Sequence, residues 1–388
     1  MRLVDVTEFY SQRGGGVRTH LTDKAAAAAR YGHSHLVFAP GPAGAITPGV
    51  RYIPGPALPY DPTYHLLWRV GALRRQLRVE RPDVLEIHSP YVAAVAALGL
   101  RPGEFGVRTF VWHADFIDTY LRGGLERTLA PIFRGRAARV ADGVVEPLWA
   151  HVRRIARACA MTVVGSRWQR DKLLAHGVER VEHIPFGVES GRFGPERRSE
   201  ARRAELLAGR PGPLVIAIGR LAVEKRWDVV VDAFARLAAR HPGAVLAVLG
   251  DGPERHVFAD RLGPRDDIRL LGFERDRDRL AETLASGDLL LHGCPFETFG
   301  LGVAEAIASG LPVVVPDQGG AAEQAPEGSS ALYPAGDVAA CVAAAERLLA
   351  RDPAELRASA HAAARRVTRV DDHFDALFAR YHELLARR

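Results

Sequence analysis

Cysteine is scarce in this chain of 388 residues, which contains only Cys159, Cys294 and Cys341. The three lie far apart in the sequence, and neither their odd number nor their spacing matches a disulfide framework or a thiolate metal site. This usage excludes a disulfide-stabilised scaffold of the secreted kind and indicates a reducing compartment.

Long hydrophobic runs are lacking as well. The longest, Tyr91–Leu100, is about half as long as a membrane-spanning helix needs to be. The first residues, Met1–Val6, have the pattern of a strand and not that of a signal peptide. We therefore expect a cytoplasmic protein, with peripheral attachment to the inner face of the plasma membrane left open.

A surplus of acidic residues is also missing, because the formal net charge is +6 and the sequence pI is about 9.5. Such a chain attracts anions, which include nucleic acid, an anionic membrane and a phosphorylated substrate. Aromatic residues make up 7% of the chain and do not interleave with basic residues in a stacking pattern, and no nucleic-acid-binding motif occurs. No nucleic-acid partner is therefore expected.

What the chain does contain is an alternation of strand-like and helix-like segments, which is typical of parallel sheets covered by helices. The predicted strands are Leu3–Val6, His35–Ala39, Val84–Ile87, Thr109–Trp112 and Met161–Val164, then Leu214–Ile218, Ala244–Leu249, Ile268–Leu271, Leu289–Leu291 and Pro312–Val315, with Ala331–Tyr333 as a further candidate. Pro185–Gly212, rich in Gly, Pro, Arg and Glu, has the composition of a linker. We expect an α/β protein of two doubly wound domains that bind ligand at the carboxyl ends of their strands.

The segment Pro295–Glu305 carries the strongest functional signal. Its two carboxylates, Glu297 and Glu305, flank a turn at Phe299–Gly302 that leads into a helix. The start of such a helix presents free backbone N–H groups, and the helix dipole favours an anion there. Glu305 lies one turn inside the helix, within reach of hydroxyls on a phosphate-bearing ligand, and Glu297 can reach groups beyond the phosphates. The spacing predicts a site for a sugar-bearing nucleoside diphosphate.

A second segment, Gly219–Lys225, follows the predicted strand Leu214–Ile218. Arg220 and Lys225 flank the start of the next helix, where two cations can neutralise a diphosphate leaving group. The chain has 3 lysines against 49 arginines, so a lysine at position 225 indicates a site that needs a compact point charge. The structural alternative is an ion pair between Arg220 and Glu224 at the helix start.

Seven short motifs occur in a fixed order along the chain. They are Gly14–His20, Ile184–Val188, Gly219–Lys225, Gly250–Pro253, Leu271–Phe273, the Glu297/Glu305 pair and Gly319–Glu323. With them the chain resembles the retaining nucleotide-sugar glycosyltransferases of family 4 over nearly its whole length. The resemblance implies a GT-B fold, in which two Rossmann-like domains face a central cleft. Residues 1–190 would form the acceptor domain, residues 191–370 the donor domain, and residues 371–388 a helix that crosses back onto the first domain.

The resemblance also implies a reaction and a set of site residues. A hexosyl group would pass from a UDP- or GDP-sugar to an acceptor hydroxyl with retention of configuration and without a metal cofactor. The expected catalytic residues are His113, Arg220, Lys225 and Glu297. The expected donor-binding residues are Gly15, Gly16, Gly219, Gly250, Asp251, Gly252, Phe273, Phe299, Gly300, Leu301 and Glu305.

Three features of the first half accompany these assignments. His113 directly follows a predicted strand and would contact the donor sugar or the acceptor hydroxyl, while His88, which ends the preceding strand, competes for that role. Asp115 would orient His113, accept a proton from the acceptor, or cap a helix. The glycines at Gly14–Gly16 let the backbone approach a ligand closely, although a plain strand-to-helix turn would use them too. Because Gly14–Arg18 lacks the G-x-G-x-x-G register, a nicotinamide-dependent dehydrogenase is disfavoured.

The acceptor stays open between a membrane lipid or lipid-linked glycan and a soluble glycan or small metabolite. Tyr64–Arg78 is basic and amphipathic, and Leu121–Arg157 contains eight arginines against three acids, as in helices that lie on anionic lipid. For the first segment, burial of its apolar stripe against the sheet is the stronger explanation. A GT-B epimerase or sugar-nucleotide hydrolase and a non-catalytic sugar-nucleotide binder are the other hypotheses. The intact set of Arg220, Lys225, Glu297 and Glu305 argues against the non-catalytic binder.

Overall fold

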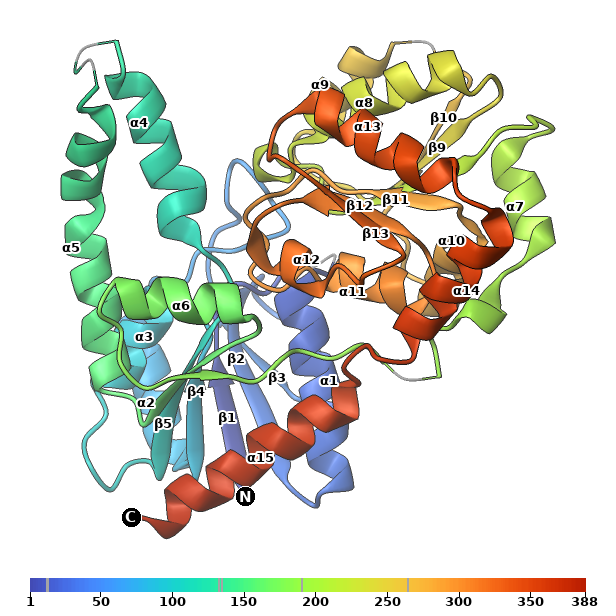
Figure 1. Ribbon diagram of the computed structural model, residues 1–388. Coiled ribbons are helices and arrows are strands. Elements are labelled where there is room, and N and C mark those ends of the chain that lie inside the picture. The colour runs from blue at the N-terminus through green and yellow to red at the C-terminus, as the bar shows by residue number, and fades with distance from the viewer. Residues whose placement is uncertain (12–13, 132, 134, 190, 264) are drawn as a thin grey trace. The chain divides into compact units, whose positions relative to one another are not determined.

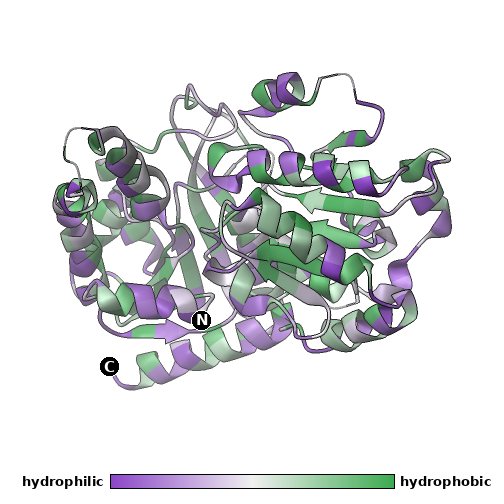
Figure 2. Ribbon diagram, turned by 45° about the horizontal axis from the view of Figure 1, so that its top comes forward, coloured by the Kyte–Doolittle hydropathy of each residue, from purple (hydrophilic) through white to green (hydrophobic). Residues whose placement is uncertain are grey.

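The computed structural model describes residues 1–11, 14–131, 133, 135–189, 191–263 and 265–388. These residues form two compact units, Met1–Pro185 with His373–Arg388, and Phe186–Asp372. Each unit has its own parallel sheet with helices on both faces (Figure 1). Most strand residues of both sheets are apolar, whereas most helices have one polar side (Figure 2).

The first unit contains a seven-stranded sheet in the order β3-β2-β1-β4-β5-β6-β7. Its strands are β1 (Arg2–Val6), β2 (Ser34–Gly41), β3 (Val50–Pro54), β4 (Val84–Ile87), β5 (Val107–Trp112), β6 (Met161–Val164) and β7 (Val181–His183). β1 pairs with β2 on one side and with β4 on the other, so the strand order reverses beside β1. In doubly wound sheets this reversal opens a crevice at the carboxyl ends of the strands. The sequence did not predict the outer strands β3 and β7, because outer strands are half-exposed and lack a continuous apolar run.

The helices of the first unit pack on this sheet, except where α4 and α5 lie side by side and extend beyond the strands (Figure 1). They are α1 (Gly16–Arg30), α2 (Val70–Glu80), α3 (Val92–Leu98), the π-helical turn η1 (Ile117–Arg122), α4 (Gly123–Leu129), α5 (Ala137–Arg157), α6 (Arg167–Ala175) and α15 (Val370–Ala386). The basic segment 121–157 forms most of the α4–α5 pair, although its residues 132 and 134 lie outside the described ones.

Two of these helices bear on expectations from the sequence. α2 begins at Val70 and not at residue 64, and it buries Leu73 and Leu77, so the helical part of the expected apolar stripe packs inward. Leu66, which precedes the helix, is 47% exposed. In α15 the aromatic and aliphatic residues Phe374, Phe378 and Tyr381 are buried in the first unit. The C-terminal helix therefore completes the core that the N-terminal residues begin.

The second unit contains a six-stranded parallel sheet in the order β10-β9-β8-β11-β12-β13. Its strands are β8 (Leu214–Ile218), β9 (Val245–Leu249), β10 (Ile268–Gly272), β11 (Leu289–Leu291), β12 (Val313–Pro316) and β13 (Ser330–Tyr333). Its helices are η2 (Pro195–Arg197), α7 (Glu200–Leu207), η3 (Val223–Lys225), α8 (Trp227–Arg240), α9 (Arg255–Leu262), α10 (Arg277–Ser286), α11 (Leu301–Ala308), α12 (Gly319–Gln324), α13 (Val338–Leu349) and α14 (Pro353–Ala364). The order reverses between β8 and β11, which directs attention to the loops after these strands.

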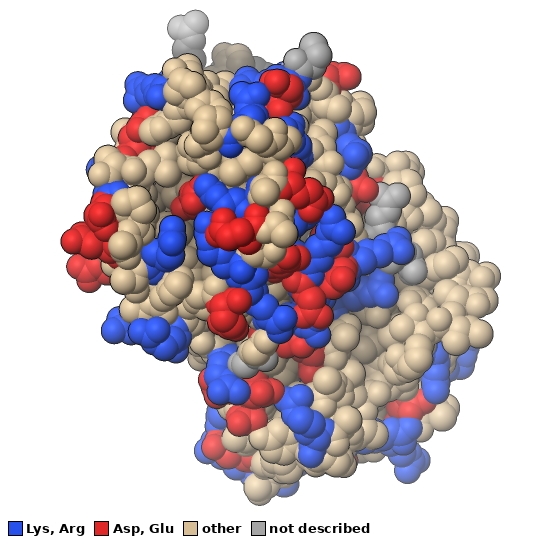
Figure 3. Space-filling model, turned by 90° about the vertical axis from the view of Figure 1, so that its right-hand side faces the viewer, with Lys and Arg blue, Asp and Glu red and all other residues tan. Residues whose placement is uncertain are grey.

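Basic and acidic side chains intermingle on the outer face shown in Figure 3. On α7 and α10 of the second unit they form ion pairs such as Arg279–Glu205 at 3.4 Å. The net positive charge is therefore not gathered on this face. Among the described residues, no helix has the length and apolar character that a membrane crossing requires.

Candidate active site

Two glycine turns meet at the carboxyl ends of β8 and β9 in the second unit. Gly219 has a φ of 154° and Gly250 a φ of 156°. A Cβ atom on Gly250 would lie 1.8 Å from the carbonyl oxygen of Gly219, and one on Gly252 would lie 2.3 Å from that of Leu221. Side chains at Gly250 and Gly252 are therefore excluded by the contact between the turns, before any ligand is considered.

The loop after β11 brings a carboxylate onto Lys225. The Nζ atom of Lys225, at the end of η3, lies 2.5 Å from Oε1 of Glu297. His292, which directly follows β11, places its Nε2 atom 3.2 Å from the same oxygen. Burial disfavours the charge of Glu297, but Lys225 and His292 outweigh it and hold the pKa of this carboxyl well below its usual range. Lys225 and Glu297 are therefore both charged. The ammonium of Lys225 has three N–H donors, and the contact with Glu297 uses one of them.

Arg220 follows β8 directly. One of its guanidinium nitrogens lies 2.8 Å from Glu224, so the ion pair considered as the structural alternative is formed. The backbone carbonyl of Arg220 also accepts a hydrogen bond of 2.9 Å from the indole of Trp227. A guanidinium has five N–H donors in a rigid fork, so the contact with Glu224 orients Arg220 without excluding a phosphate ligand.

The start of α11 lies on the same edge of the sheet. Gly300 precedes the helix with a φ of 89°, which favours glycine, and Phe299 before it is buried. The first turn of α12 packs directly against this loop, because a Cβ atom on Gly320 would lie 2.7 Å from the carbonyl oxygen of Phe299. The backbone N–H of Gly320 donates to the carbonyl of Glu297 at 2.6 Å. α12 therefore fixes the loop that carries Glu297 and the N–H groups at Leu301.

Glu305 lies within α11 and pairs with a residue that the sequence did not single out. Arg277, the first residue of α10, donates to Oε1 of Glu305 at 2.6 Å. The side chain of Glu305 is 4% exposed, and its burial raises the pKa of the carboxyl even though Arg277 opposes the shift. No sequence pattern joins these two residues, because they belong to different helices 28 positions apart.

The remaining predicted donor residues occupy the neighbouring turns. Asp251 accepts a hydrogen bond of 2.9 Å from the backbone of Gly252 and lies 3.7 Å from Arg255. Phe273 follows β10 and its side chain is 42% exposed, which is high for a residue of this type.

Two other features of the second unit are weaker candidates for a binding site, one for an anion and one for a metal ion. A groove of about 630 Å³ between η2, α7 and α10 is lined by more carboxylates than guanidiniums, which repels phosphate. His292, Cys294 and Glu297 place possible metal-ligand atoms within 4.8 Å of one another. However, Lys225 adds a positive charge there, and burial raises the pKa of the Cys294 thiol to about 12, so the thiolate form that binds metal is disfavoured.

The Asp-x-Asp spacing, which holds divalent cations in some phosphate-binding sites, occurs at 276–278. Asp276 caps α10 by accepting from the backbone N–H groups of Asp278 and Arg279. Asp278 itself lies 3.0 Å from Arg192. Both carboxylates are therefore engaged in holding the start of α10.

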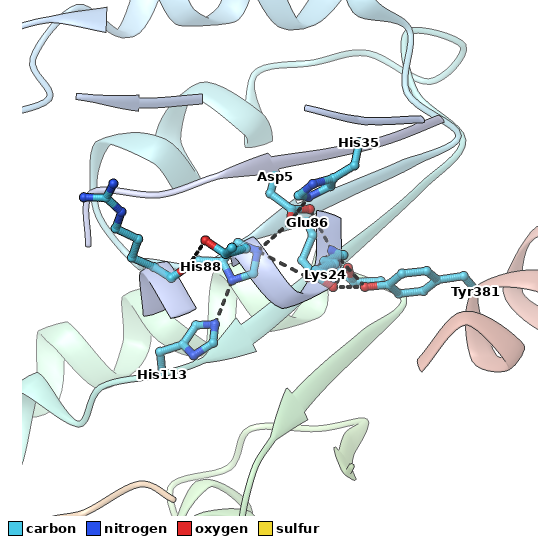
Figure 4. Close-up of polar contacts among 10 residues, drawn as sticks. Asp5, Lys24, His35, Glu86, His88, His113 and Tyr381 are labelled. Atoms are coloured by element: carbon cyan, nitrogen blue, oxygen red, sulfur yellow. Dashed lines mark hydrogen bonds and ion pairs between the residues drawn. The ribbon is translucent and has the colours of Figure 1, made fainter. Parts of the chain in front are cut away.

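In the first unit, His113 and His88 are partners and not competitors. Nε2 of His113, just after β5, lies 2.7 Å from Nδ1 of His88, just after β4 (Figure 4). Asp115 instead accepts from Lys172 and from the backbone of Asp118, which favours the capping role over orientation of His113. The sequence did not identify this pairing, because it depends on two neighbouring strands that are about 25 residues apart in the chain.

The glycine loop before α1 has space around it. Gly14 and Gly15 have φ values of 126° and 125°, and α1 begins at Gly16. Among the described residues, nothing lies within 4 Å of a Cβ atom built on Gly16, and a Cβ atom on Gly15 would contact Tyr64 Oη at 3.8 Å. At Gly250 a contact with neighbouring backbone excludes any side chain. Among the described residues, Gly15 and Gly16 have no such contact, and the space beside them suits the approach of a ligand.

Comparison with known proteins follows the same division of the chain. Residues 14–192 match the family described as Glycosyltransferase Family 4, and residues 198–367 match the one described as Glycosyl transferases group 1. The GDP-mannose-dependent alpha-(1-6)-phosphatidylinositol dimannoside mannosyltransferase of Mycobacterium tuberculosis (strain ATCC 25177 / H37Ra) is 32% identical over 324 residues, which are 81% of this chain and 79% of that one.

Two further relatives agree with this match. The GDP-mannose-dependent alpha-mannosyltransferase of Mycobacterium tuberculosis (strain CDC 1551 / Oshkosh) is 32% identical over 352 residues, or 87% of this chain and 85% of that one. The structure of sucrose-phosphate synthase from Thermosynechococcus elongatus, a GT-B protein, superimposes with a TM-score of 0.77 at 19% identity over 100% of both chains. The chain therefore belongs to glycosyltransferase family 4 and is a retaining, nucleotide-sugar-dependent glycosyltransferase of the GT-B fold.

Proposed function

We propose that this glycosyltransferase transfers a mannosyl group from GDP-mannose to a hydroxyl of a phosphatidylinositol-type glycolipid on the cytoplasmic side of a membrane. Two relatives at 32% identity carry GDP-mannose in their names, and one of them acts on a phosphatidylinositol dimannoside. The donor and the acceptor are both inferred from these names. The reaction proposed for this donor and this acceptor is the retaining glycosyl transfer described above.

The constellation of Arg220, Lys225 and the start of α11 carries this proposal. Arg220 and Lys225 supply two positive charges, and the turn at Gly300 adds backbone N–H groups and the positive end of the helix dipole. Together they stabilise the charge that develops on the departing diphosphate. The two side-chain cations do here what a divalent cation does in other transferases, so the proposed reaction needs no metal.

The two glutamates have different roles in the proposed site. Glu305 binds ribose hydroxyls, with Arg277 fixing its carboxylate. One oxygen of Glu297 is already held by Lys225 and His292, so the carboxylate binds a sugar hydroxyl and does not act as the nucleophile. The acceptor then attacks from the face that the leaving group departs from, and the leaving phosphate takes the acceptor's proton. His113 in the first unit contacts the sugar or the acceptor hydroxyl.

An exposed apolar surface on the first unit supports a lipid acceptor. Tyr60 and Trp68, in the segment between β3 and α2, are each 57% exposed. The guanidinium of Arg69 lies over the Trp68 ring, 5.1 Å from its centroid. Aromatic rings next to basic side chains are typical of protein surfaces that contact the headgroup region of an anionic membrane.

A nucleotide-release assay tests the proposal. GDP-mannose, UDP-glucose and ADP-glucose are each incubated with the enzyme, with and without vesicles that contain phosphatidylinositol mannosides. We expect release of GDP that requires the vesicles, a product with the α configuration, and no loss of rate in EDTA. Release that is equal without any acceptor would indicate an epimerase or a hydrolase, and transfer to a soluble sugar alone would exclude the lipid.

A further inference from the structure

A fully buried ionic cluster lies next to His88, which in turn contacts His113, in the first unit (Figure 4). Lys24 on α1 donates to Asp5 on β1 at 2.8 Å and to Glu86 on β4 at 2.6 Å, and all three side chains are 0% exposed. Thr109 on β5 donates to Glu86 at 3.1 Å, and the hydroxyl of Tyr381 on α15 donates to the same carboxylate. Residues from both ends of the chain therefore build this cluster.

The cluster has one negative charge more than it has positive charges. Burial opposes ionisation of both carboxylates, but Lys24 outweighs it, so the pKa of Asp5 lies well below its usual range and that of Glu86 falls to about 2. Two carboxylates thus share one ammonium. The excess negative charge faces two imidazoles: His35, 2.8 Å from Asp5, and His88, 3.2 Å from Glu86 and 3.4 Å from Asp5.

These contacts determine where the protons lie. An ionised carboxylate cannot donate, and the negative charge of Asp5 and Glu86 therefore favours a proton on the Nε2 atom of His88, which lies near both carboxylates without hydrogen-bond geometry to either. In a neutral His88, Nδ1 is then an acceptor. The 2.7 Å contact between this Nδ1 and Nε2 of His113 contains one proton, which must come from His113. His113 therefore holds its proton on Nε2 and presents Nδ1 as an acceptor.

A shared metal ion is a weaker explanation of the same contact. Nitrogen atoms of His20, His88 and His113 lie within 4.8 Å of one another, which is close enough for three ligands of one metal ion. In a tetrahedral zinc site with Zn–N bonds of about 2.0–2.1 Å, two ligand nitrogens lie roughly 3.3 Å apart. The separation of 2.7 Å is that of a hydrogen bond.

We propose that His88 is the positioning residue of the site in the first unit, and that it holds His113 in the tautomer whose Nδ1 accepts a hydrogen bond from a substrate hydroxyl. The proposal rests on the proposed function only for the identity of that hydroxyl. The tautomer of His113 itself follows from the carboxylates of Asp5 and Glu86. Their charge sets the protonated nitrogen of His88, and His88 in turn sets that of His113.

The charges around this pair make the arrangement sensitive to acid. The groups that face it are Asp5 on β1, His20 and Lys24 on α1, His35 on β2, Glu86 on β4, and His373 and Tyr381 on α15. Burial and His88 lower the pKa of His113 well below its ordinary value, so His113 stays neutral. Burial disfavours the charged form of His88, but the two carboxylates outweigh it and raise its pKa. When His88 takes up a second proton it donates from Nδ1, and His113 must then move its proton to Nδ1 and lose its acceptor.

Two substitutions at His88 separate its two contacts. His88→Gln keeps an amide N–H where Nε2 faces the carboxylates, but has no acceptor toward His113. His88→Asn places its amide oxygen where Nδ1 was, so it can still accept from His113. The exposed His382 on α15, changed to Asn, is the matched control. Histidine-labelled full-length protein is studied by long-range ¹H–¹⁵N spectra, which distinguish protonated from unprotonated ring nitrogens, and the His113 signals are identified by their loss in His113→Asn.

At a pH above the raised pKa of His88, we expect unprotonated Nδ1 and protonated Nε2 at His113 in the wild type and in His88→Asn, and a mixture of tautomers in His88→Gln. Nδ1 of the wild type should become protonated as the pH falls through that pKa and His88 charges. A wild-type His113 that stays protonated on Nδ1 at alkaline pH, or one that His88→Gln leaves unchanged there, would overturn the proposal. These spectra need no substrate, so their outcome is independent of the donor and acceptor.

Transfer rates provide the second readout. His88→Gln should lower kcat by about 10- to 100-fold with little change in the KM for the donor, because misplacing a group that orients the substrate by about 1 Å can cost up to that factor. His88→Asn should restore most of the loss. Full activity of His88→Gln would contradict the positioning role even if the tautomer changes, whereas inactivity of the wild type with every donor would contradict only the proposed function.

Discussion

The side chains of the candidate donor site in the second unit are held by charge pairs that leave part of each group available. Lys225 and Glu297 form the clearest case, since each favours the charged form of the other. Burial disfavours the Lys225 ammonium, but Glu297 outweighs it and raises its pKa, so the cation persists at every physiological pH. A compact charge held in this way is suited to a diphosphate leaving group.

The first prediction concerns this cation. Lys225→Ala should reduce kcat by about 10²–10³, since removing one group that stabilises a developing anion costs roughly 2–4 kcal/mol. Steady-state kinetics with GDP-mannose will measure the effect. Arg236→Ala, which removes an exposed cation from α8 without touching the site, is the control and should keep normal turnover. Near-normal turnover of Lys225→Ala would contradict the leaving-group role.

A second prediction at this scale concerns Glu8, in the loop after β1. Its carboxylate accepts from the backbone N–H of Ala93 at 2.6 Å and from Ser89, and burial raises its pKa to about 7. A carboxyl whose pKa is raised on folding contributes stability below its unfolded pKa and loses it as the pH rises through about 7. Glu8→Gln should remove this loss, which is on the order of 2 kcal/mol.

Urea unfolding at pH 5 and at pH 8 will measure the loss of stability that the ionisation of Glu8 causes. The wild type should lose stability between the two pH values relative to Glu8→Gln, and the exposed Glu179→Gln variant should follow the wild type. A constant difference between Glu8→Gln and the wild type would show that Glu8 does not titrate in this range.

At the scale of elements, the turns that follow the strands place the candidate residues. The turns after β8 and β9 contact each other through glycine backbone, and the start of α12 supports the loop after β11. Backbone contacts of this kind leave little freedom, so the residues they carry are positioned by the sheet. Among the residues that the structure describes, Gly15 and Gly16 have no comparable backbone contact.

The third prediction tests the contact between turns. Gly250→Ala should destabilise the second unit by about 2–4 kcal/mol, because the new Cβ atom would lie 1.8 Å from the Gly219 oxygen. Gly209→Ala is the matched control, since Gly209 also has a positive φ, of 80°, but nothing lies within 4 Å of its Cβ position. It should cost about 1 kcal/mol. Equal effects in chemical unfolding would mean that the turns can move apart.

At the scale of the whole molecule, the two compact units use different parts of the sequence. The second unit is continuous from Phe186 to Asp372, whereas the first combines the N-terminal residues with the last sixteen, His373–Arg388. Phe374, Leu377 and Phe378 of α15 are buried in this first core, and Tyr381 reaches its ionic cluster. Integrity of the N-terminal unit therefore depends on the C-terminus.

The fourth prediction follows from this arrangement. Removal of residues 373–388 should expose β1, β4 and β5 to hydrogen exchange while β8, β9 and β11 keep their protection, because only the first unit loses buried apolar surface. Tyr381→Phe keeps the packing and removes one hydroxyl from a buried carboxylate, so it should cost the first unit about 1–3 kcal/mol and leave it folded. Unchanged exchange of β1 after the truncation would contradict the prediction.

The buried strands could be predicted from the sequence, and the candidate donor residues could be selected from it, because their signals are local. Apolar runs predicted the inner strands of both sheets, and the confirmed GT-B fold followed from motif order. Glu297 and Glu305, and likewise Arg220 and Lys225, are only a few positions apart in the sequence. Each pair therefore indicated charged residues near the start of a helix. The outer strands β3 and β7 lacked such a signal, because a half-exposed strand needs few apolar residues.

Only the tertiary structure decided which side chains meet. Arg277 pairs with Glu305, His292 with Glu297, and His88 with His113 across separate elements, and Tyr381 reaches Glu86 from the other end of the chain. The physical reason is that hydrophobic periodicity and turn chemistry act between residues that are near in sequence. Hydrogen bonds and charge pairs act over a few ångströms in space, so their partners are set by strand order and helix packing.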